Sequence, residues 1–396
     1  MSIQETFSTI PQGPAVARPD AGSRYLFGPV VDFLCLGGLT FAVLPFVLLL
    51  PLEVKPTVAL VMALLANLVN HPHFAHSYQI FYRGFGAKLA GRGYDRELSA
   101  RYTFAGLVAP AGLIAFLAYA VGSDDIVLLG RAANVMALLV GWHYVKQGYG
   151  MLMVDSVLKR QFFDRTAKGV LLANAYATWV LAWVSFNIAG SQLSAWGVHY
   201  YAFSVPPILQ TLGIGICLAT GTATVWVLWQ HWASHGRRLP WNGVMAYVVS
   251  LYPWLMFIHY NPMWILVIPA LHSLQYLLVV WRFELNRTRS LDDAQAPPRS
   301  PVLRLILKKK FRARLLGFAV LGLLLGFLGF WGLPLALNGL IAMDSALPEA
   351  KVALFSFWMF INIHHYLMDN VIWRRQNPEA RRFLFGDTRP ATPKAA

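Results

Sequence analysis

Long apolar runs separated by short polar or basic loops recur along most of the chain. A helix of about 20 apolar residues is long enough to cross the roughly 30 Å hydrocarbon core of a bilayer. Ten such runs lie at 29–51, 57–80, 103–122, 126–153, 168–189, 206–230, 242–260, 262–283, 314–341 and 350–373. Segments of this length span a membrane as helices, because their backbone polar groups must be satisfied internally. The pattern predicts an all-α, polytopic membrane helix bundle of about ten transmembrane helices.

The remaining segments divide the chain into one membrane domain and two tails. Residues 1–28 are polar and lack the apolar run of a signal peptide, so we expect a mobile N-terminal tail. Residues 29–375 are expected to form a single transmembrane helical domain. Within it, the basic segment 284–314 is expected to lie on anionic headgroups. Residues 376–396 contain three prolines and are expected to be a disordered tail.

Composition supports a membrane protein. Hydrophobic residues make up 57% of the 396 residues and charged residues only 13%, whereas an average soluble domain carries roughly 25% charged residues. The mean hydropathy is +0.50. The two cysteines, Cys35 and Cys217, lie in no paired motif. The sequence therefore indicates neither a disulfide framework nor a thiolate metal site.

The distribution of charge predicts the orientation in the membrane. Basic residues collect in alternate loops, after the second, fourth, sixth, eighth and tenth predicted spans, and the other loops are acidic or contain few cations. By the positive-inside rule, both termini are cytoplasmic. We expect a multi-pass protein of a bacterial-type inner (cytoplasmic) membrane. The net charge of +15 is then mostly the cytoplasmic excess of Lys and Arg, and no nucleic-acid partner is expected.

Histidines interrupt four of the apolar runs. They are His71, His73 and His76 in the second run, His143 in the fourth, His272 in the eighth, and His364 and His365 in the tenth. An ionisable side chain inside a bilayer is costly, so each cluster is a candidate functional site. All four runs cross in the same predicted direction, with their histidines toward the cytoplasmic side. We therefore expect the clusters to converge on one site there, with a kink of the second helix at Pro72.

The local spacing suggests metal ligation, because most clusters have a polar side chain about one helical turn away that could orient an imidazole. Asp369 follows His365 by one turn. The expected metal ligands are His71, His73, His76, His143, His272, His364, His365 and Asp369. The expected catalytic residues, which would support these ligands, are Tyr144, Gln147, Gln275 and Tyr276. Imidazole with carboxylate suits iron, copper or zinc. The histidines exceed what one tetrahedral zinc needs; two iron or two copper ions would use them all, and one iron ion would leave some of them as supporting residues.

These features resemble the histidine-rich integral-membrane iron oxygenases, of the desaturase, hydroxylase or carotenoid-cleaving type. The shared features are many helices, cytoplasmic-side histidines and the His364–His365 pair. The spacing differs from the desaturase boxes, since here it is His-x-His-x-x-His and an isolated His-His pair. The resemblance implies an O2-dependent non-haem iron oxidoreductase that acts on a lipid-like substrate. Through it we expect iron, as one ion or two, ahead of copper or zinc. Its expected partners are membrane lipids and an electron donor protein.

Two other interpretations stay open. A haem protein would use histidines from two helices as axial ligands, although the sequence contains no Cys-x-x-Cys-His attachment motif. A transporter would use the histidines to relay protons or to pass a metal ion, and ten spans would suit it. A visible spectrum tests the first alternative, and liposome flux of metal or protons tests the second.

Overall fold

The computed structural model describes residues 24–189, 194–261, 263–293, 301–337, 340 and 349–385. Within this part of the chain nearly all residues are helical, and two short strands, β1 (Ser194–Ala195) and β2 (Val198–His199), pair antiparallel. The predicted all-α architecture is therefore confirmed.

The first half of the bundle contains α1 (Pro29–Phe33), η1 (Leu34–Gly38), α2 (Leu39–Leu49), η2 (Leu52–Val54), α3 (Lys55–Ala66), α4 (Asn70–Tyr82), α5 (Phe85–Leu89), α6 (Arg96–Thr103), η3 (Phe104–Val108), α7 (Ala109–Gly122) and α8 (Ile126–Leu158). The second half contains α9 (Arg165–Ile188), α10 (Pro207–Ser234), α11 (Trp241–Tyr260), α12 (Trp264–Asp293), α13 (Pro301–Phe327), η4 (Leu328–Gly332), α14 (Leu333–Ala336), α15 (Glu349–Ile372) and α16 (Pro378–Phe385). The η segments are π-helix except η2, which is a 3-10 turn.

Eight helical stretches among the described residues are long and apolar enough to cross a membrane, which indicates a multi-pass membrane protein. The other two predicted spans, 242–260 and 350–373, coincide with α11 and α15, which are helical but are not among the eight. The histidines and Asp369 of α15 lower its hydropathy. The count of about ten spans and the cytoplasmic location of the termini stay predictions.

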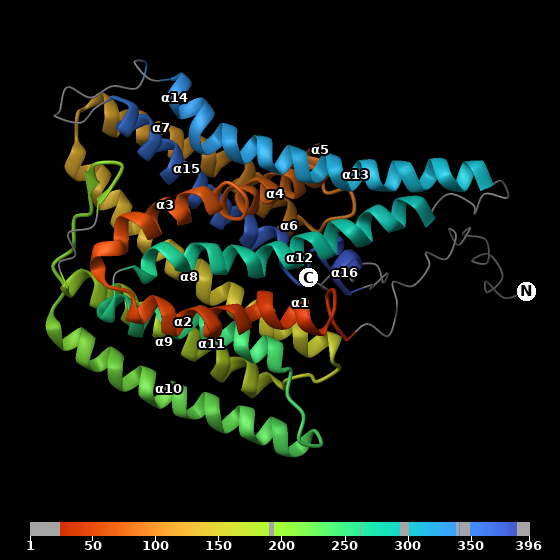
Figure 1. Ribbon diagram of the computed structural model, residues 1–396, viewed down its shortest axis with the longest axis horizontal. Coiled ribbons are helices and arrows are strands. Elements are labelled where there is room, and N and C mark those ends of the chain that lie inside the picture. Colours follow the sequence, from red (N-terminus) through yellow and green to blue (C-terminus); the bar gives the residue numbers. More distant parts are fainter. Residues whose placement is uncertain are drawn as a thin grey trace, which may run out of the picture.

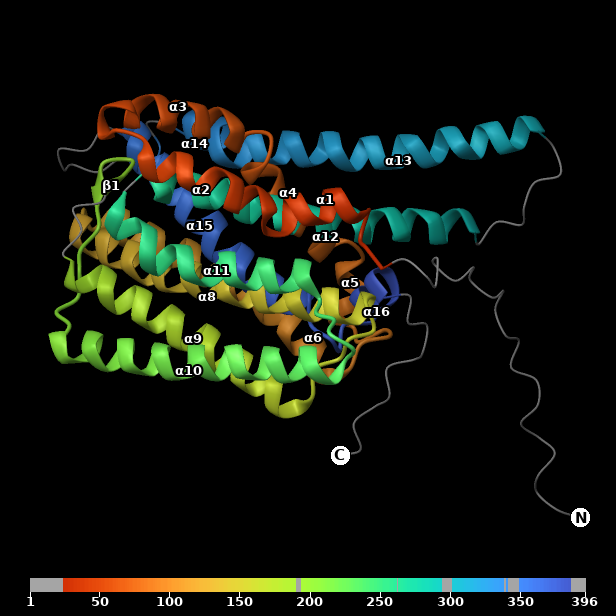
Figure 2. The ribbon, with the colours of Figure 1, turned by 60° about the horizontal axis from the view of Figure 1, so that its bottom comes forward.

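Helices α4, α8, α12 and α15 form the interior of the bundle. The long helix α15 runs through its middle and contacts both α4 and α8 (Figures 1 and 2). On the outside, α13 packs along α4, α11 packs along α8, and α10 packs against α9 at the edge of the molecule. Most of the large apolar side chains of α10 are exposed, as expected of a helix that faces lipid.

The second predicted span, 57–80, is broken into two helices. Helix α3 ends at Ala66 and α4 begins at Asn70, so the expected kink lies a few residues before Pro72. Pro72 itself lies in the first turn of α4, where the N–H group that proline lacks needs no partner within the helix. The Trp331 indole donates a hydrogen bond to Asn67 Oδ1 (3.0 Å) and holds the break. The histidines of this run therefore lie on a separate helix in the interior.

Of two expectations about the polar segments, one stays a prediction and the other is corrected by the structure. The basic segment 284–314 is occupied at both ends by α12 and α13, and the Glu284 side chain is almost fully buried in ion pairs with Arg83 (2.9 Å) and Arg287 (2.6 Å). The start of this segment thus packs within the protein, and the position of its basic part on headgroups stays a prediction. Within the predicted disordered tail 376–396, residues Pro378–Phe385 form α16, which packs on α12.

Local sequence explains why α16 forms. Pro378 occupies the first helical position, which proline tolerates. Phe383 and Leu384 are buried, and the Phe383 ring lies 5.2 Å from the Phe283 ring of α12. Residues 24–28 of the predicted mobile tail are also fixed, because Leu26 is buried and donates a backbone hydrogen bond to Asp32 (2.6 Å). Residues 1–23 and 386–396 of the two tails lie outside the described part.

Candidate metal centre

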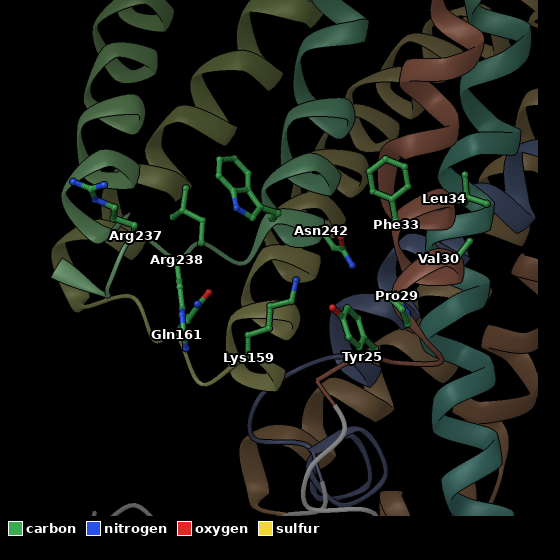
Figure 3. Close-up of a pocket in the computed structure, with 12 residues that line it drawn as sticks. Tyr25, Pro29, Val30, Phe33, Leu34, Lys159, Gln161, Arg237, Arg238 and Asn242 are labelled. Atoms are coloured by element: carbon green, nitrogen blue, oxygen red, sulfur yellow. The ribbon is translucent and has the colours of Figure 1, made fainter. Parts of the chain in front are cut away.

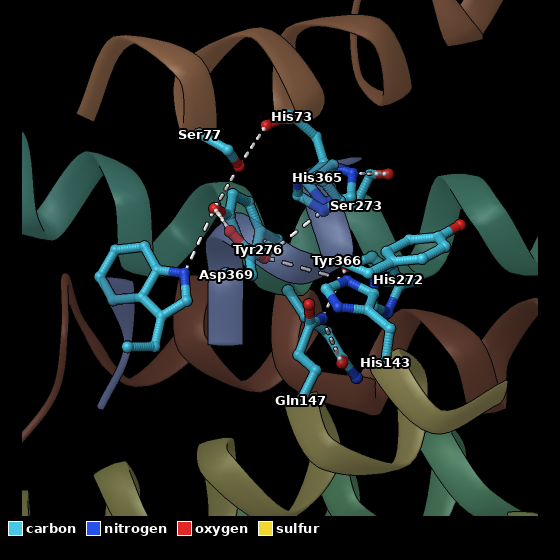
Figure 4. A network of polar contacts seen from close by, with 12 residues as sticks. His73, Ser77, His143, Gln147, His272, Ser273, Tyr276, His365, Tyr366 and Asp369 are labelled. Carbon is cyan, nitrogen blue, oxygen red and sulfur yellow. Dashed lines mark hydrogen bonds and ion pairs between the residues drawn. The ribbon is translucent and has the colours of Figure 1, made fainter. Parts of the chain in front are cut away.

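Four of the predicted ligands meet in the interior of the bundle. They are His73 of α4, His143 of α8, and His365 and Asp369 of α15. Their ligand atoms all lie within 4.8 Å of one another, and all four residues are buried. Figure 4 shows these side chains approaching one another from three helices, two of them from α15, with α12 alongside. These three histidines and one aspartate, called the His/Asp cluster below, could bind a metal ion.

The spacing of the ligand atoms is close to that of a metal site. Asp369 Oδ2 lies 3.4 Å from His365 Nε2 and 4.0 Å from His143 Nε2. The ring centroids of His73 and His143 lie 4.5 Å and 4.9 Å from that of His365. Atoms bound at about 2.0–2.1 Å to one tetrahedral ion are about 3.4 Å apart. The cluster therefore needs only a small contraction to surround an ion.

The atoms that face the centre lack hydrogen-bond partners among the described residues. They are Nε2 of His73, of His143 and of His365, and Oδ2 of Asp369, and the other nitrogen of His365 also lacks a partner. Leaving one buried polar atom unsatisfied costs about 1–3 kcal/mol. Several such atoms at one point are unfavourable unless something binds them together, and a single cation would bind one ligand atom of each of the four residues. The donor set therefore fits a metal ion.

The chain fixes the ring orientation of His73. Its Nδ1 lies 3.0 Å from Ser273 Oγ. The single proton of Ser273 is directed to Asn70 Oδ1 or to the Pro269 carbonyl, both 2.8 Å away. Ser273 Oγ must then accept from His73 Nδ1–H, which leaves the lone pair on Nε2. This is the arrangement of a ligating imidazole, whose other nitrogen donates to a neighbour.

The carboxylate is held in a similar way. The Tyr276 hydroxyl donates to Asp369 Oδ1 at 2.7 Å and leaves Oδ2 toward the cluster. Tyr276 is itself fixed by contacts with Ser77 Oγ (2.5 Å) and with the Trp373 indole N–H (3.2 Å). Figure 4 shows this chain of contacts on one side of the cluster. Of the four expected catalytic residues, Tyr276 thus lies in contact with a candidate ligand.

His272 of α12 lies beside the four residues. Its ring is 5.0 Å from that of His143 and 5.4 Å from that of His73, and neither of its nitrogens has a partner among the described residues. It stacks on the Tyr144 ring at 3.7 Å. A cavity of about 20 Å³ touches His272, Tyr144 and Gln275, which is room for about one water molecule.

The two expected catalytic glutamines lie one layer further out. Gln147 donates to the backbone carbonyl of His272 (3.0 Å) and to Gln275 Oε1 (3.3 Å). Gln275 donates to the Leu36 carbonyl at 2.9 Å. Both glutamines join helices near the cluster and fix the backbone of α12. They contact none of the four clustered residues through a hydrogen bond in the described part of the chain.

Three of the expected ligands are placed elsewhere. His71 stacks on Phe330 at 4.1 Å and His76 on Phe318 at 4.2 Å, so both face α13 and η4 instead of the centre. Helix α13 can approach α4 this closely because it presents glycines, and a Cβ atom at Gly322 would overlap the His76 ring. The expected single site with eight ligands is therefore not formed by these residues.

His364 is also outside the cluster, although it precedes His365 directly. Its Nδ1 bonds the Tyr78 hydroxyl (2.9 Å) and its Nε2 lies 2.8 Å from the Ala105 carbonyl. With both nitrogens partnered, this histidine joins α15 to α4 and η3. It has no nitrogen left for a metal.

Several residues near the cluster were missed at the level of sequence. Ser77 and Ser273 each follow a histidine directly, and that polar step inside an apolar run was the available signal. Tyr366 stacks on His143 at 4.7 Å and is held by Asn362 (2.8 Å). The Trp373 indole N–H donates to the Tyr276 hydroxyl at 3.2 Å.

No protein-family model, no curated protein and no solved structure matches this chain. The fold and the site themselves define the class, which is a multi-pass helical membrane protein with a buried His/Asp cluster that could bind a metal ion. The resemblance to the integral-membrane iron oxygenases stays a prediction.

Proposed function

We propose that this protein is an integral-membrane, metal-dependent oxidoreductase, an O2-dependent non-haem iron oxygenase, hydroxylase or desaturase that acts on a lipid-like substrate. The observation that carries the proposal is the meeting of three buried imidazoles and one buried carboxylate inside a membrane-type bundle, where each residue keeps one ligand atom without a hydrogen-bond partner among the described residues. Histidines with a carboxylate are the donor set of non-haem iron centres. Copper and zinc use the same donors and are the alternatives to iron.

His73, His143, His365 and Asp369 would hold the metal. Bound iron would supply the redox chemistry needed to activate O2. Ser273 and Tyr276 would keep His73 and Asp369 in their ligating orientations, as their hydrogen bonds already do. The buried position excludes bulk water, which strengthens electrostatic interactions within the site. His272, with both nitrogens unpartnered among the described residues, would hold a second ion or exchange a proton beside the small cavity.

The surroundings support an apolar substrate. The small cavity beside His272 is lined from α2, α11 and α12, and α2 exposes apolar side chains such as Phe41 and Phe46 on its outer surface. A lipid-like molecule would reach the site sideways from the bilayer, and electrons would come from a donor protein. We place the protein in a bacterial-type inner membrane with both termini in the cytoplasm, as the loop charges predict.

Metal analysis of the purified full-length chain tests this proposal. The protein is stripped with a chelator, reconstituted separately with Fe(II), Zn(II) and Cu(II), and assayed for metal content and for O2 consumption with lipid extracts. We expect at least about one iron per chain and O2 consumption with iron alone. Full O2-consuming activity with well under one metal ion per chain would refute the proposal.

Two further readouts separate the other interpretations. A Soret band at near-stoichiometric yield would replace the non-haem centre by a haem. Metal or proton flux into liposomes, abolished by His272→Ala, would favour a transporter. A matched variant, His76→Ala, removes a histidine of α4 that lies outside the cluster and should leave both metal content and flux unchanged.

A further inference from the structure

A second, larger cavity lies at one end of the bundle, away from the metal centre. Its volume is about 700 Å³, and it is bounded by the start of α1, the end of α8 and the α10–α11 connection (Figure 3). Lys159 at its floor follows His143 on the same helix by 16 residues, so the two residues lie about 24 Å apart along the axis. The cavity is therefore separate from the His/Asp cluster.

One side of this cavity is cationic. Lys159, Arg237 and Arg238 line it. Lys159 pairs with the buried Asp155 carboxylate at 2.8 Å, and Arg237 lies over the Trp232 ring at 5.6 Å. Arg238 makes no ion pair or hydrogen bond to any described residue. Three cations against two carboxylates, Asp155 and the Asp32 of the opposite wall, leave one net positive charge, which attracts an anion.

Two amide groups on the same side lack partners. Asn242 is 7% exposed, and its Nδ2 has no hydrogen-bond partner among the described residues. Gln161 Oε1 is likewise buried and unpartnered. Both residues line the cavity, and in Figure 3 the Asn242 amide lies near the end of the Lys159 side chain. Because a buried amide without a partner is unfavourable, the Asn242 N–H donor indicates a ligand with acceptor oxygens, whereas Gln161 Oε1 is an acceptor and would need an O–H or N–H group of the ligand.

The other side of the cavity is apolar and open. Val30, Phe33 and Leu34 line it and are 67%, 47% and 42% exposed. This wall is held in place, because the Asp32 carboxylate accepts backbone hydrogen bonds from Leu26 (2.6 Å) and Phe27 (3.0 Å) at the start of α1. A cavity with cations at one side and exposed apolar side chains at the other matches a phospholipid, which has a charged headgroup and apolar acyl chains.

We propose that this cavity binds the headgroup of an anionic phospholipid. The phosphate contacts Lys159, Arg237 and Arg238, the Asn242 amide donates to a phosphate oxygen, and the acyl chains lie along Val30 and Phe33. Arginine and lysine clusters next to a membrane helix recognise anionic lipid in this way. The inference goes beyond the proposed function and does not depend on a metal.

Lipid binding by the intact protein tests the proposal. Delipidated full-length protein in detergent is titrated with phosphatidylglycerol or with phosphatidylcholine of the same acyl chains, and bound lipid is counted by native mass spectrometry. The test variant is Arg237→Asn/Arg238→Gln, with asparagine chosen because position 237 has a positive φ of 59°. The control is Arg92→Gln/Arg165→Gln, which removes two exposed arginines outside the cavity.

We expect the wild type to prefer phosphatidylglycerol, and each removed arginine to weaken that binding about fivefold, so the test variant loses about 25-fold. The control variant should bind as the wild type does. Equal binding of phosphatidylcholine, or an unchanged affinity of the test variant, would overturn the proposal. The metal content and thermal stability of the test variant should be unchanged. A loss of lipid binding then does not depend on whether the proposed metal centre is correct.

A second measurement distinguishes lipid from free phosphate. Val30→Ser alters the exposed apolar wall without touching a cation. We expect it to weaken phosphatidylglycerol binding while inorganic phosphate competes poorly with the lipid in every variant. If inorganic phosphate displaced the lipid at equal concentration, the cavity would be a phosphate site and the assignment to a lipid would be wrong.

Discussion

His364 and His365 are neighbours on α15 and are equally buried, yet the structure gives them opposite surroundings. Both nitrogens of His364 have partners, the Tyr78 hydroxyl at 2.9 Å and the Ala105 carbonyl at 2.8 Å. Neither nitrogen of His365 has a hydrogen-bond partner among the described residues, and its Nε2 lies 3.4 Å from Asp369 Oδ2. Replacing either one by alanine removes the same side-chain volume, so the cost of the cavity nearly cancels in the comparison.

The two substitutions should therefore have different effects. His364→Ala leaves the Tyr78 hydroxyl and the Ala105 carbonyl without the hydrogen-bond partner that His364 supplies. At about 1–3 kcal/mol for each such group, the free energy of unfolding falls by about 2–6 kcal/mol beyond the cavity cost. His365→Ala breaks no hydrogen bond and instead removes a candidate ligand. Removing a residue that only hydrogen-bonds a metal ligand typically lowers metal affinity about 10–100-fold. Removing the ligand itself should lower metal affinity by at least about 100-fold, or about 2.8 kcal/mol.

The assay measures metal content at a buffered metal concentration and thermal unfolding in detergent, with and without a chelator. Metal that binds the folded protein raises its apparent stability. For His365→Ala we expect lost metal and no further effect of the chelator. For His364→Ala we expect a lower unfolding temperature but retained metal and a retained effect of the chelator. If His365→Ala bound metal as tightly as the wild type, or if both variants lost metal equally, the assignment of the cluster would be refuted.

Three further substitutions test other contacts. Tyr276→Phe removes the hydrogen bond to Asp369 and should weaken metal binding about 10–100-fold in a chelator competition, with unchanged affinity as the contrary result. Gly322→Leu should push α13 from His76 and cost about 1–3 kcal/mol of unfolding free energy while metal content stays constant. Burial lowers the pKa of Lys88, which lies outside the spans, below that of a lysine in the unfolded chain. Between these two pKa values the unfolded chain binds a proton at Lys88 that the folded protein has lost. Wild-type stability should then rise with alkaline pH up to the usual lysine pKa of about 10.5, and Lys88→Met should flatten that rise in pH-dependent unfolding.

The membrane nature of the protein and the general location of its site follow from the sequence alone. Hydropathy and run length are local properties, and the cost of polar groups in a bilayer makes a buried histidine conspicuous wherever it occurs. His73, His143, His272, His365 and Asp369 could therefore be found among the candidates without any structure. The same reasoning could not rank them, because every histidine in an apolar run looks alike at this level.

Tertiary structure decided which of these candidates meet. Neighbours in sequence are about 100° apart around a helix, so His364 and His365 must face different partners. On α4, the glycines of α13 allow that helix to cover His71 and His76, and only His73 is left toward α12 and α15. The same holds for α16, whose buried face exists only because α12 lies beside it. Which side chains converge depends on helix rotation and on the packing of helices far apart in the sequence, and neither is encoded in the local pattern of one run.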